Sequence, residues 1–215
     1  FFDEKYWRTW HDNLASHALP QLRRIDGDHI EVGAAPVATD KGWLLIYSYI
    51  EDYYDEAKRT FSIEAALLDR HDPQQLIART EAFLVPQEIY EEYGLVPRIA
   101  FPPGATLRTH DSGRFDVWYG GADTVCAKAA IRLNDLMRAL DPDKPPRTFV
   151  RAKENPILSP QGEGFEARDV FNAAAVDIDG TVYIFYRAMS MDNTSTIGLA
   201  LSKDGIHIDE RLPEP

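Results

Sequence analysis

Two polar side chains interrupt apolar stretches near the end of the sequence. Asn172 lies inside "VFNAAAV", and Arg187 ends the predicted strand "VYIFYR". A buried amide or guanidinium group needs hydrogen-bonding partners, which come either from the protein or from a ligand. Sugars suit such groups, because amide, carboxylate and guanidinium groups form paired hydrogen bonds with neighbouring hydroxyls. The residues alone leave a structural ion pair inside the sheet and a ligand site equally open.

Charged residues extend this candidate set. Asp123 follows another tyrosine-ended strand, in "VWYGGADT", where a turn-capping aspartate is the alternative interpretation. Glu166, Arg168 and Asp169 precede the strand that contains Asn172. A solvated loop is the alternative for these three, and we favour it for at least one of them. The residues alone assign none of these carboxylates a catalytic role.

The elements that would position these residues form a repeat. Three segments each show an apolar strand, a turn that ends in glycine, and a second apolar strand that ends in Tyr47, Tyr119 or Tyr186. An Ala- and Leu-rich strand follows in each case. Repeats of three or four antiparallel strands predict the blades of an all-β propeller, with a long β-sandwich as the alternative. Propellers typically close with about four to eight blades, so about three blades predict an incomplete propeller.

Charge and composition exclude some classes of partner. The 215-residue sequence has a formal net charge of −12 and a single cysteine, Cys126. An acidic surface argues against nucleic acid and anionic membranes as partners. One cysteine excludes an internal disulfide. We see neither an apolar run of membrane-spanning length nor a signal peptide, which predicts a cytoplasmic protein. The chain begins with Phe1 rather than Met, so a periplasmic or secreted location stays open.

Several longer strings resemble glycoside hydrolase family 130. The opening blade of that family is similar to "ENPILSP", "FEARDVFNAAAV", "VYIFYRA" and "STIGLALSKDGIHI". Its closing blades are similar to "VGAAPVATDKGWLLIYS", "AALLDRHDP", "IARTEAFLVPQEIYEEYGLVPRIAFPPGA" and "VWYGGADTV". The resemblance implies a five-bladed β-propeller that acts on β-mannosides, with a mannoside or oligosaccharide as its partner.

The order of the matching segments is reversed. Residues 1–140 resemble the C-terminal blades of the family, 141–148 form a Pro-rich joint, and 149–215 resemble the N-terminal first blade. A piece that spans tandem or permuted copies would give this order, and so would an incomplete or rearranged product. We expect an open array of blades to expose apolar faces and to associate as a homo-oligomer.

The resemblance also bears on the candidate residues. It favours a substrate pocket for Asn172, Arg187 and Asp123, and it places the catalytic aspartate in a Glu-Asp-Pro-Arg-like motif that this sequence lacks. The catalytic residue is therefore unknown. Phosphorylases of the family usually carry a histidine that helps to hold phosphate where this chain has Ser48. That departure leans slightly toward hydrolysis, although inorganic phosphate stays open as a co-substrate. No other cofactor is implied.

Three functions follow as hypotheses. The first is an inverting hydrolase or phosphorylase that cleaves β-mannosidic or related linkages. The second is a non-catalytic sugar-binding or structural propeller fragment, because the general acid is missing. A third, weaker hypothesis is another five-bladed sugar enzyme. The acidic run "YIEDYYDE" at 49–56 is interpreted as a solvated loop, with its tyrosines at the rim of a sugar site as the alternative.

Overall fold

Three antiparallel sheets make up most of the protein, which confirms the all-β prediction. The computed structural model describes residues 20–108, 111, 113–141, 143 and 149–215. The sequence also predicts a short helix or an ordered loop at 3–24, and this segment lies outside the described residues except for η1 (Pro20–Leu22) and the residues after it. No helix in the described part is long and apolar enough to cross a membrane.

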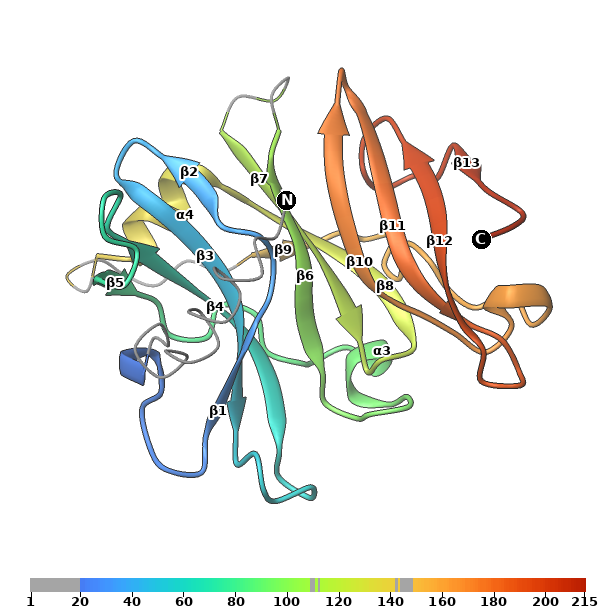
Figure 1. The fold of residues 1–215 in the computed structure, drawn as a ribbon, viewed down its shortest axis with the longest axis horizontal. Helices are drawn as coiled ribbons and strands as arrows, with labels where there is room; N and C mark the ends of the chain where they lie inside the picture. Colours follow the sequence, from blue (N-terminus) through green and yellow to red (C-terminus); the bar gives the residue numbers. More distant parts are fainter. Residues whose placement is uncertain (1–19, 109–110, 112, 142, 144–148) are drawn as a thin grey trace, which may run out of the picture.

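Blade 1 is the N-terminal sheet, drawn in blue and cyan in Figure 1. The central pair, β3 and β4, consists of long and almost fully buried strands because both carry continuous apolar runs. The strands of blade 1 are β1 (His29–Val32), β2 (Val37–Thr39), β3 (Gly42–Glu51), β4 (Thr60–Leu68) and β5 (Leu76–Arg79).

Blades 2 and 3 repeat the same four-stranded order. Blade 2 contains β6 (Ala100–Leu107), β7 (Arg114–Gly121), β8 (Val125–Arg132) and β9 (Val150–Arg151), with α3 (Ile89–Glu92) before it and α4 (Leu133–Ala139) after β8. Blade 3 contains β10 (Asp169–Ile178), β11 (Thr181–Met189), β12 (Ser195–Ser202) and β13 (Glu210–Arg211), preceded by η2 (Gly164–Glu166). Strand β9 follows the Pro-rich joint and still pairs with β8, so blade 2 contains residues from both sides of that joint.

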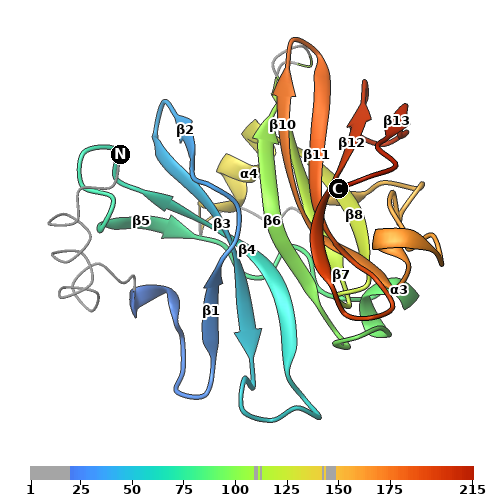
Figure 2. The ribbon, with the colours of Figure 1, turned by 45° about the vertical axis from the view of Figure 1, so that its right-hand side comes forward.

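The first strands of the blades approach one another closely, as Figure 2 shows for β6 and β10. Glycine permits this approach at two points. A Cβ atom at Gly33 would stand 2.6 Å from the carbonyl oxygen of Pro102, and one at Gly104 would stand 2.7 Å from that of Ala173. Backbone therefore packs directly on backbone where the three blades converge. In β6 and β10, the pairing with the next strand shifts near this point.

A buried ionic network also joins blade 2 to blade 3. Arg108 Nε lies 3.0 Å from Asp177 Oδ2, and Lys128 Nζ lies 2.9 Å from Asp116 Oδ2. The Lys128 ammonium reaches the carbonyl of Asp204 at 3.4 Å. Because buried charges need partners, these contacts favour one arrangement of the two blades over others.

Candidate functional site

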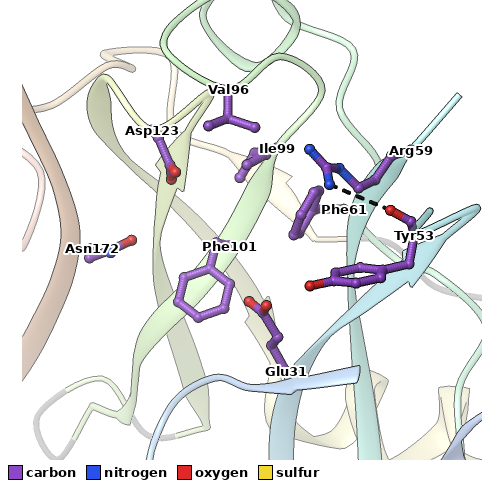
Figure 3. A pocket seen from close by; sticks show the side chains of 9 residues that line it. All are labelled: Glu31, Tyr53, Arg59, Phe61, Val96, Ile99, Phe101, Asp123 and Asn172. Carbon is purple, nitrogen blue, oxygen red and sulfur yellow. Dashed lines mark hydrogen bonds between the residues drawn. The ribbon is translucent and has the colours of Figure 1, made fainter. Parts of the chain in front are cut away.

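A pocket of about 330 Å³ opens where the three blades converge (Figure 3). The hairpin between β3 and β4 forms one wall, and the β7–β8 turn and the start of β10 form the opposite wall. Its lining combines aromatic rings with carboxylate, amide and guanidinium groups, a mixture that suits a polar organic ligand with apolar faces. The lining residues are Glu31, Tyr53, Arg59, Phe61, Val96, Ile99, Phe101, Asp123 and Asn172.

Asn172 occupies an irregularity in β10. Its φ is 55°, and the pairing of β10 with β11 shifts between Phe171 and Ala174. Such a bulge redirects a side chain away from the regular alternation of a strand. The Asn172 Oδ1 atom is buried and has no hydrogen-bond partner among the described residues. An orphaned buried acceptor at the wall of a pocket indicates a place for a ligand donor.

Asp123 reaches the same pocket from the tight turn between β7 and β8. Both central residues of the turn, Ala122 and Asp123, have positive φ values, of 45° and 53°. Figure 3 shows the Asp123 carboxylate directed into the pocket near Asn172. Burial raises the pKa of Asp123 to about 6, although the charge of Arg187 acts in the opposite direction. The structure thus brings together two residues that the sequence singled out in different blades.

Arg187 lies behind this wall rather than in the lining. Its guanidinium carbon stands 4.9 Å from the centre of the Phe171 ring, and its Nε donates to Ser195 Oγ at 2.8 Å. The Arg187 charge nevertheless acts on Asp123. In the described structure, Arg187 therefore affects the electrostatics of the pocket without lining it.

The three charged residues before β10 also lie outside the lining. Glu166 Oε2 accepts hydrogen bonds from Tyr186 Oη at 2.9 Å and Arg211 Nη2 at 2.6 Å. Arg168 Nε donates to Asp169 Oδ2 at 2.6 Å. These groups are engaged with protein partners, so their assignment to a substrate remains a prediction.

Ser48 is fully buried in β3, and its hydroxyl has no hydrogen-bond partner among the described residues. It pairs with Glu31 of β1 and Ile63 of β4, and it does not line the pocket. The altered phosphate position suggested by the sequence therefore lies behind the pocket wall, next to Glu31.

Several lining residues were not assigned from the sequence. Glu31 and Arg59 carried no motif, and Tyr53 belongs to the acidic run whose first interpretation was a solvated loop. Tyr54, next to it, is 84% exposed and does fit that interpretation. The alternation of strand residues could have placed Glu31 on the convergent side of β1, but nothing in the sequence orients the hairpin loop.

Comparison with known proteins identifies a family that matches this chain. The family profile of glycoside hydrolase family 130, described as beta-1,4-mannooligosaccharide phosphorylase, matches residues 9–142. A beta-1,4-mannooligosaccharide phosphorylase of Ruminococcus albus is 33% identical over 136 residues, which are 63% of this chain and 38% of that protein. A 1,2-beta-oligomannan phosphorylase of Thermoanaerobacter sp. is 31% identical, over 60% of this chain and 41% of that protein.

Solved structures support the fold. A family 117 glycoside hydrolase of Zobellia galactanivorans superimposes with a TM-score of 0.61 at 12% identity, over 87% of this chain and 56% of that one. A family 32 β-fructofuranosidase of Bombyx mori gives a TM-score of 0.54 at 16% identity, over 99% of this chain and 42% of that one. The chain spans about two fifths of the length of the curated relatives that it matches. The profile match and these relatives show that the chain belongs to glycoside hydrolase family 130.

Proposed function

We propose that this chain forms the sugar-binding part of an enzyme that cleaves β-mannosidic linkages with inversion, by phosphorolysis. The observation that carries the proposal is the meeting of Asn172 and Asp123 in one pocket. An orphaned amide oxygen and a half-buried carboxylate in one pocket offer acceptors to the hydroxyl groups of a sugar. Phosphorolysis is proposed because the similar proteins from Ruminococcus albus and Thermoanaerobacter are phosphorylases of mannose-containing oligosaccharides.

The aromatic side chains of the pocket support a carbohydrate ligand. Phe61 and Phe101 both line it, between the polar wall and the β3–β4 hairpin. The C–H faces of a sugar ring pack on aromatic carbon, while its hydroxyl groups take up hydrogen bonds at its edge. A pocket with both kinds of group therefore fits a sugar better than a charged metabolite.

Hydrolysis is a second candidate, favoured by the charges of the pocket. Arg59 is the one cation among the lining residues, and it shares the pocket with the carboxylates of Glu31 and Asp123. Phosphate is held by clusters of cationic groups and backbone N–H donors, whereas Arg59 is a single cation among the described lining residues. Two carboxylates at a glycoside would instead suit activation of water. We assign no general acid among the residues of this chain.

Calorimetry with β-linked mannobiose tests the sugar site in this 215-residue protein. We expect the Asn172→Ala variant to bind the sugar at least about tenfold more weakly. The substitution removes Asn172 Oδ1, the acceptor that we assign to a hydroxyl group of the sugar. Asn134→Ala is the matched control, since Asn134 is an exposed asparagine on α4. Equal affinity for the wild type and Asn172→Ala would refute this assignment of the pocket.

Product analysis separates the reaction types. Incubation with manno-oligosaccharides should release mannose 1-phosphate only when phosphate is present if the chemistry is phosphorolysis. Release of free mannose, independent of phosphate, would establish hydrolysis. Sugar binding without turnover by this chain would favour the non-catalytic alternative for the isolated segment.

A further inference from the structure

Tyr53 presents a polar group to the pocket from the wall opposite Asp123 and Asn172 (Figure 3). Its side chain is half-buried, and its hydroxyl points toward the centre of the pocket. Among the described residues, the hydroxyl has no hydrogen-bond partner, whereas the buried tyrosines Tyr47 and Tyr49 both donate to carboxylates. The hydroxyl of Tyr53 is therefore available to a ligand.

The backbone of the hairpin loop 52–59 is fixed by its own hydrogen bonds. Asp28 anchors its first residue, because Asp28 Oδ1 accepts from the Asp52 amide at 3.3 Å. The Tyr53 amide donates to the Gly27 carbonyl at 2.9 Å. The Arg59 amide closes the loop on the Asp55 carbonyl at 2.7 Å. The loop thus holds Tyr53 at one position relative to β1.

Two neighbouring side chains lie close to the ring of Tyr53. The His29 ring lies against it at a centroid distance of 4.4 Å, and the Arg59 guanidinium carbon stands 5.8 Å from its centre. Arg59 Nη1 also donates to the Tyr53 carbonyl at 3.4 Å. Because His29 packs against the ring and Arg59 lies near it, we expect the ring to offer a sugar its hydroxyl edge rather than a stacking surface.

We propose that Tyr53 is a specificity-determining residue whose hydroxyl hydrogen-bonds one hydroxyl group of the bound mannoside. The proposal rests on the sugar-binding function proposed above. A donor that is already oriented loses little freedom on binding, so it discriminates between sugars that have and lack the matching hydroxyl. His29 acts as a positioning residue, since it contacts the Tyr53 ring and does not line the pocket.

The substitution Tyr53→Phe removes the hydroxyl and keeps a ring that can contact His29 and Arg59. We expect it to weaken binding of β-linked mannobiose about 3- to 10-fold in calorimetry, the range for one neutral hydrogen bond. Tyr54→Phe is the matched control, because Tyr54 is its neighbour in sequence, is 84% exposed and does not line the pocket. It should bind like the wild type.

A panel of methyl β-mannosides, each lacking one hydroxyl group, tests which sugar group is involved. One deoxy sugar should bind equally to the wild type and Tyr53→Phe. It lacks the hydroxyl group that Tyr53 contacts, so neither complex can form that hydrogen bond. His29→Ala should weaken binding of the complete sugar, and His29→Phe should restore it by supporting the ring again. If Tyr53→Phe weakened the binding of every sugar in the panel by the same factor, the assignment of Tyr53 would be overturned.

The two proposals fail in different ways. If Asn172→Ala loses binding while Tyr53→Phe retains the wild-type affinity, the sugar site stands and the role of Tyr53 is refuted. If the wild-type protein binds none of the mannosides, both proposals are refuted.

Discussion

Blades 1 and 2 both bury a cluster of tyrosine, glutamate and arginine, but they take the charged residues from opposite elements. In blade 2 the glutamate comes from the segment before the sheet. Tyr119 Oη donates to Glu91 Oε1 of α3 at 2.7 Å. The arginine comes from the outermost strand, where Arg151 donates to both carboxylate oxygens of Glu91, at 2.7 and 2.8 Å.

Blade 3 follows the pattern of blade 2. Glu166 of η2 precedes the sheet and accepts from Tyr186 at 2.9 Å. Arg211 of β13, the outermost strand, donates to the same carboxylate oxygen at 2.6 Å. In both blades, the pair connects the segment before the first strand to the strands of the sheet.

Blade 1 exchanges the positions of the glutamate and the arginine. Its glutamate, Glu64, lies in the middle of the sheet on β4 and accepts from Tyr47 at 2.7 Å. Its arginine, Arg24, lies in the segment before β1 and donates to the same carboxylate. The outermost strand still carries Arg79, which now donates to the carbonyl of Leu22 at 2.8 Å. The connection between segment and sheet is therefore common to the three blades, whereas the direction of the charge pair varies.

The residue paired with the tyrosine on the neighbouring strand differs between the two arrangements, in which the glutamate comes either from the sheet or from the segment before it. This position holds Glu64 in blade 1, Ala127 in blade 2 and Gly198 in blade 3. A carboxylate there supplies the partner from within the sheet. Gly198 leaves space that the Tyr186 ring occupies, and Glu166 reaches the tyrosine hydroxyl from outside the sheet.

The largest test of this comparison is Glu91→Ala. Glu91 is fully buried, so its loss leaves Tyr119 and Arg151 without their shared acceptor. We expect a loss of about 3–5 kcal/mol in the free energy of unfolding, measured by urea denaturation. Glu64→Ala should cost less, because Arg24 also lies 3.5 Å from Glu81.

Glu92→Ala is the matched control for this pair. Glu92 is a neighbouring acidic residue on α3 that lies outside the cluster, and its replacement should cost less than about 1 kcal/mol. Equal losses in the free energy of unfolding for Glu64→Ala and Glu91→Ala would contradict the expected difference between the clusters of blades 1 and 2.

A smaller effect is expected from Gly198→Ala. A Cβ atom at Gly198 would stand 2.4 Å from the ring of Tyr186, which Glu166 and Arg211 hold in place. We expect a loss of about 1–3 kcal/mol in the free energy of unfolding, because the ring has to move.

The reverse substitution in blade 2, Ala127→Gly, provides a comparison for Gly198→Ala. Ala127 already tolerates a Cβ at the equivalent position, and Ala127→Gly should cost about 1–2 kcal/mol through backbone entropy and the loss of one buried methyl group. A Gly198→Ala variant as stable as the wild type would show that the tyrosine of blade 3 is not confined by its cluster.

The fold was predictable to the extent that each blade repeats one pattern. The apolar runs before Tyr47, Tyr119 and Tyr186 mark β3, β7 and β11. These strands continue past the predicted ends, to Glu51, Gly121 and Met189. The outermost strands could not be predicted, because β9 and β13 contain two residues each and are defined only by pairing with a longer neighbour. No periodicity exists over so short a length.

The site was predictable in part for a related reason. Asn172 stands out because it interrupts an apolar strand, and the structure places it in the pocket with Asp123. Glu166 carries a similar signal before the same strand, yet its partner Arg211 lies 45 residues further along the chain. A carboxylate looks the same in sequence whether its partner is a ligand or a distant arginine. Glu64 is a further example, because its role follows only from its contacts with Arg24 and Tyr47 in three dimensions.

The smallest expected effect concerns the pH dependence of blade 1. Burial raises the pKa of Glu64 above its ordinary value of 4.5, outweighing the hydrogen bonds from Tyr47 and Arg24. The folded protein then binds a proton at Glu64 more tightly than the unfolded chain does. This contribution to stability is fully present below about pH 4.5 and is lost as pH rises through the folded-state pKa.

Urea denaturation between pH 4 and pH 8 measures this effect in the wild type and in Glu64→Gln. The Glu64 contribution should fall with rising pH by at most about 1.4 kcal/mol for each pH unit, and Glu64→Gln should lack this component because it cannot ionise. Identical pH profiles for the wild type and Glu64→Gln would contradict the raised pKa, because folding would then leave the proton affinity of Glu64 unchanged.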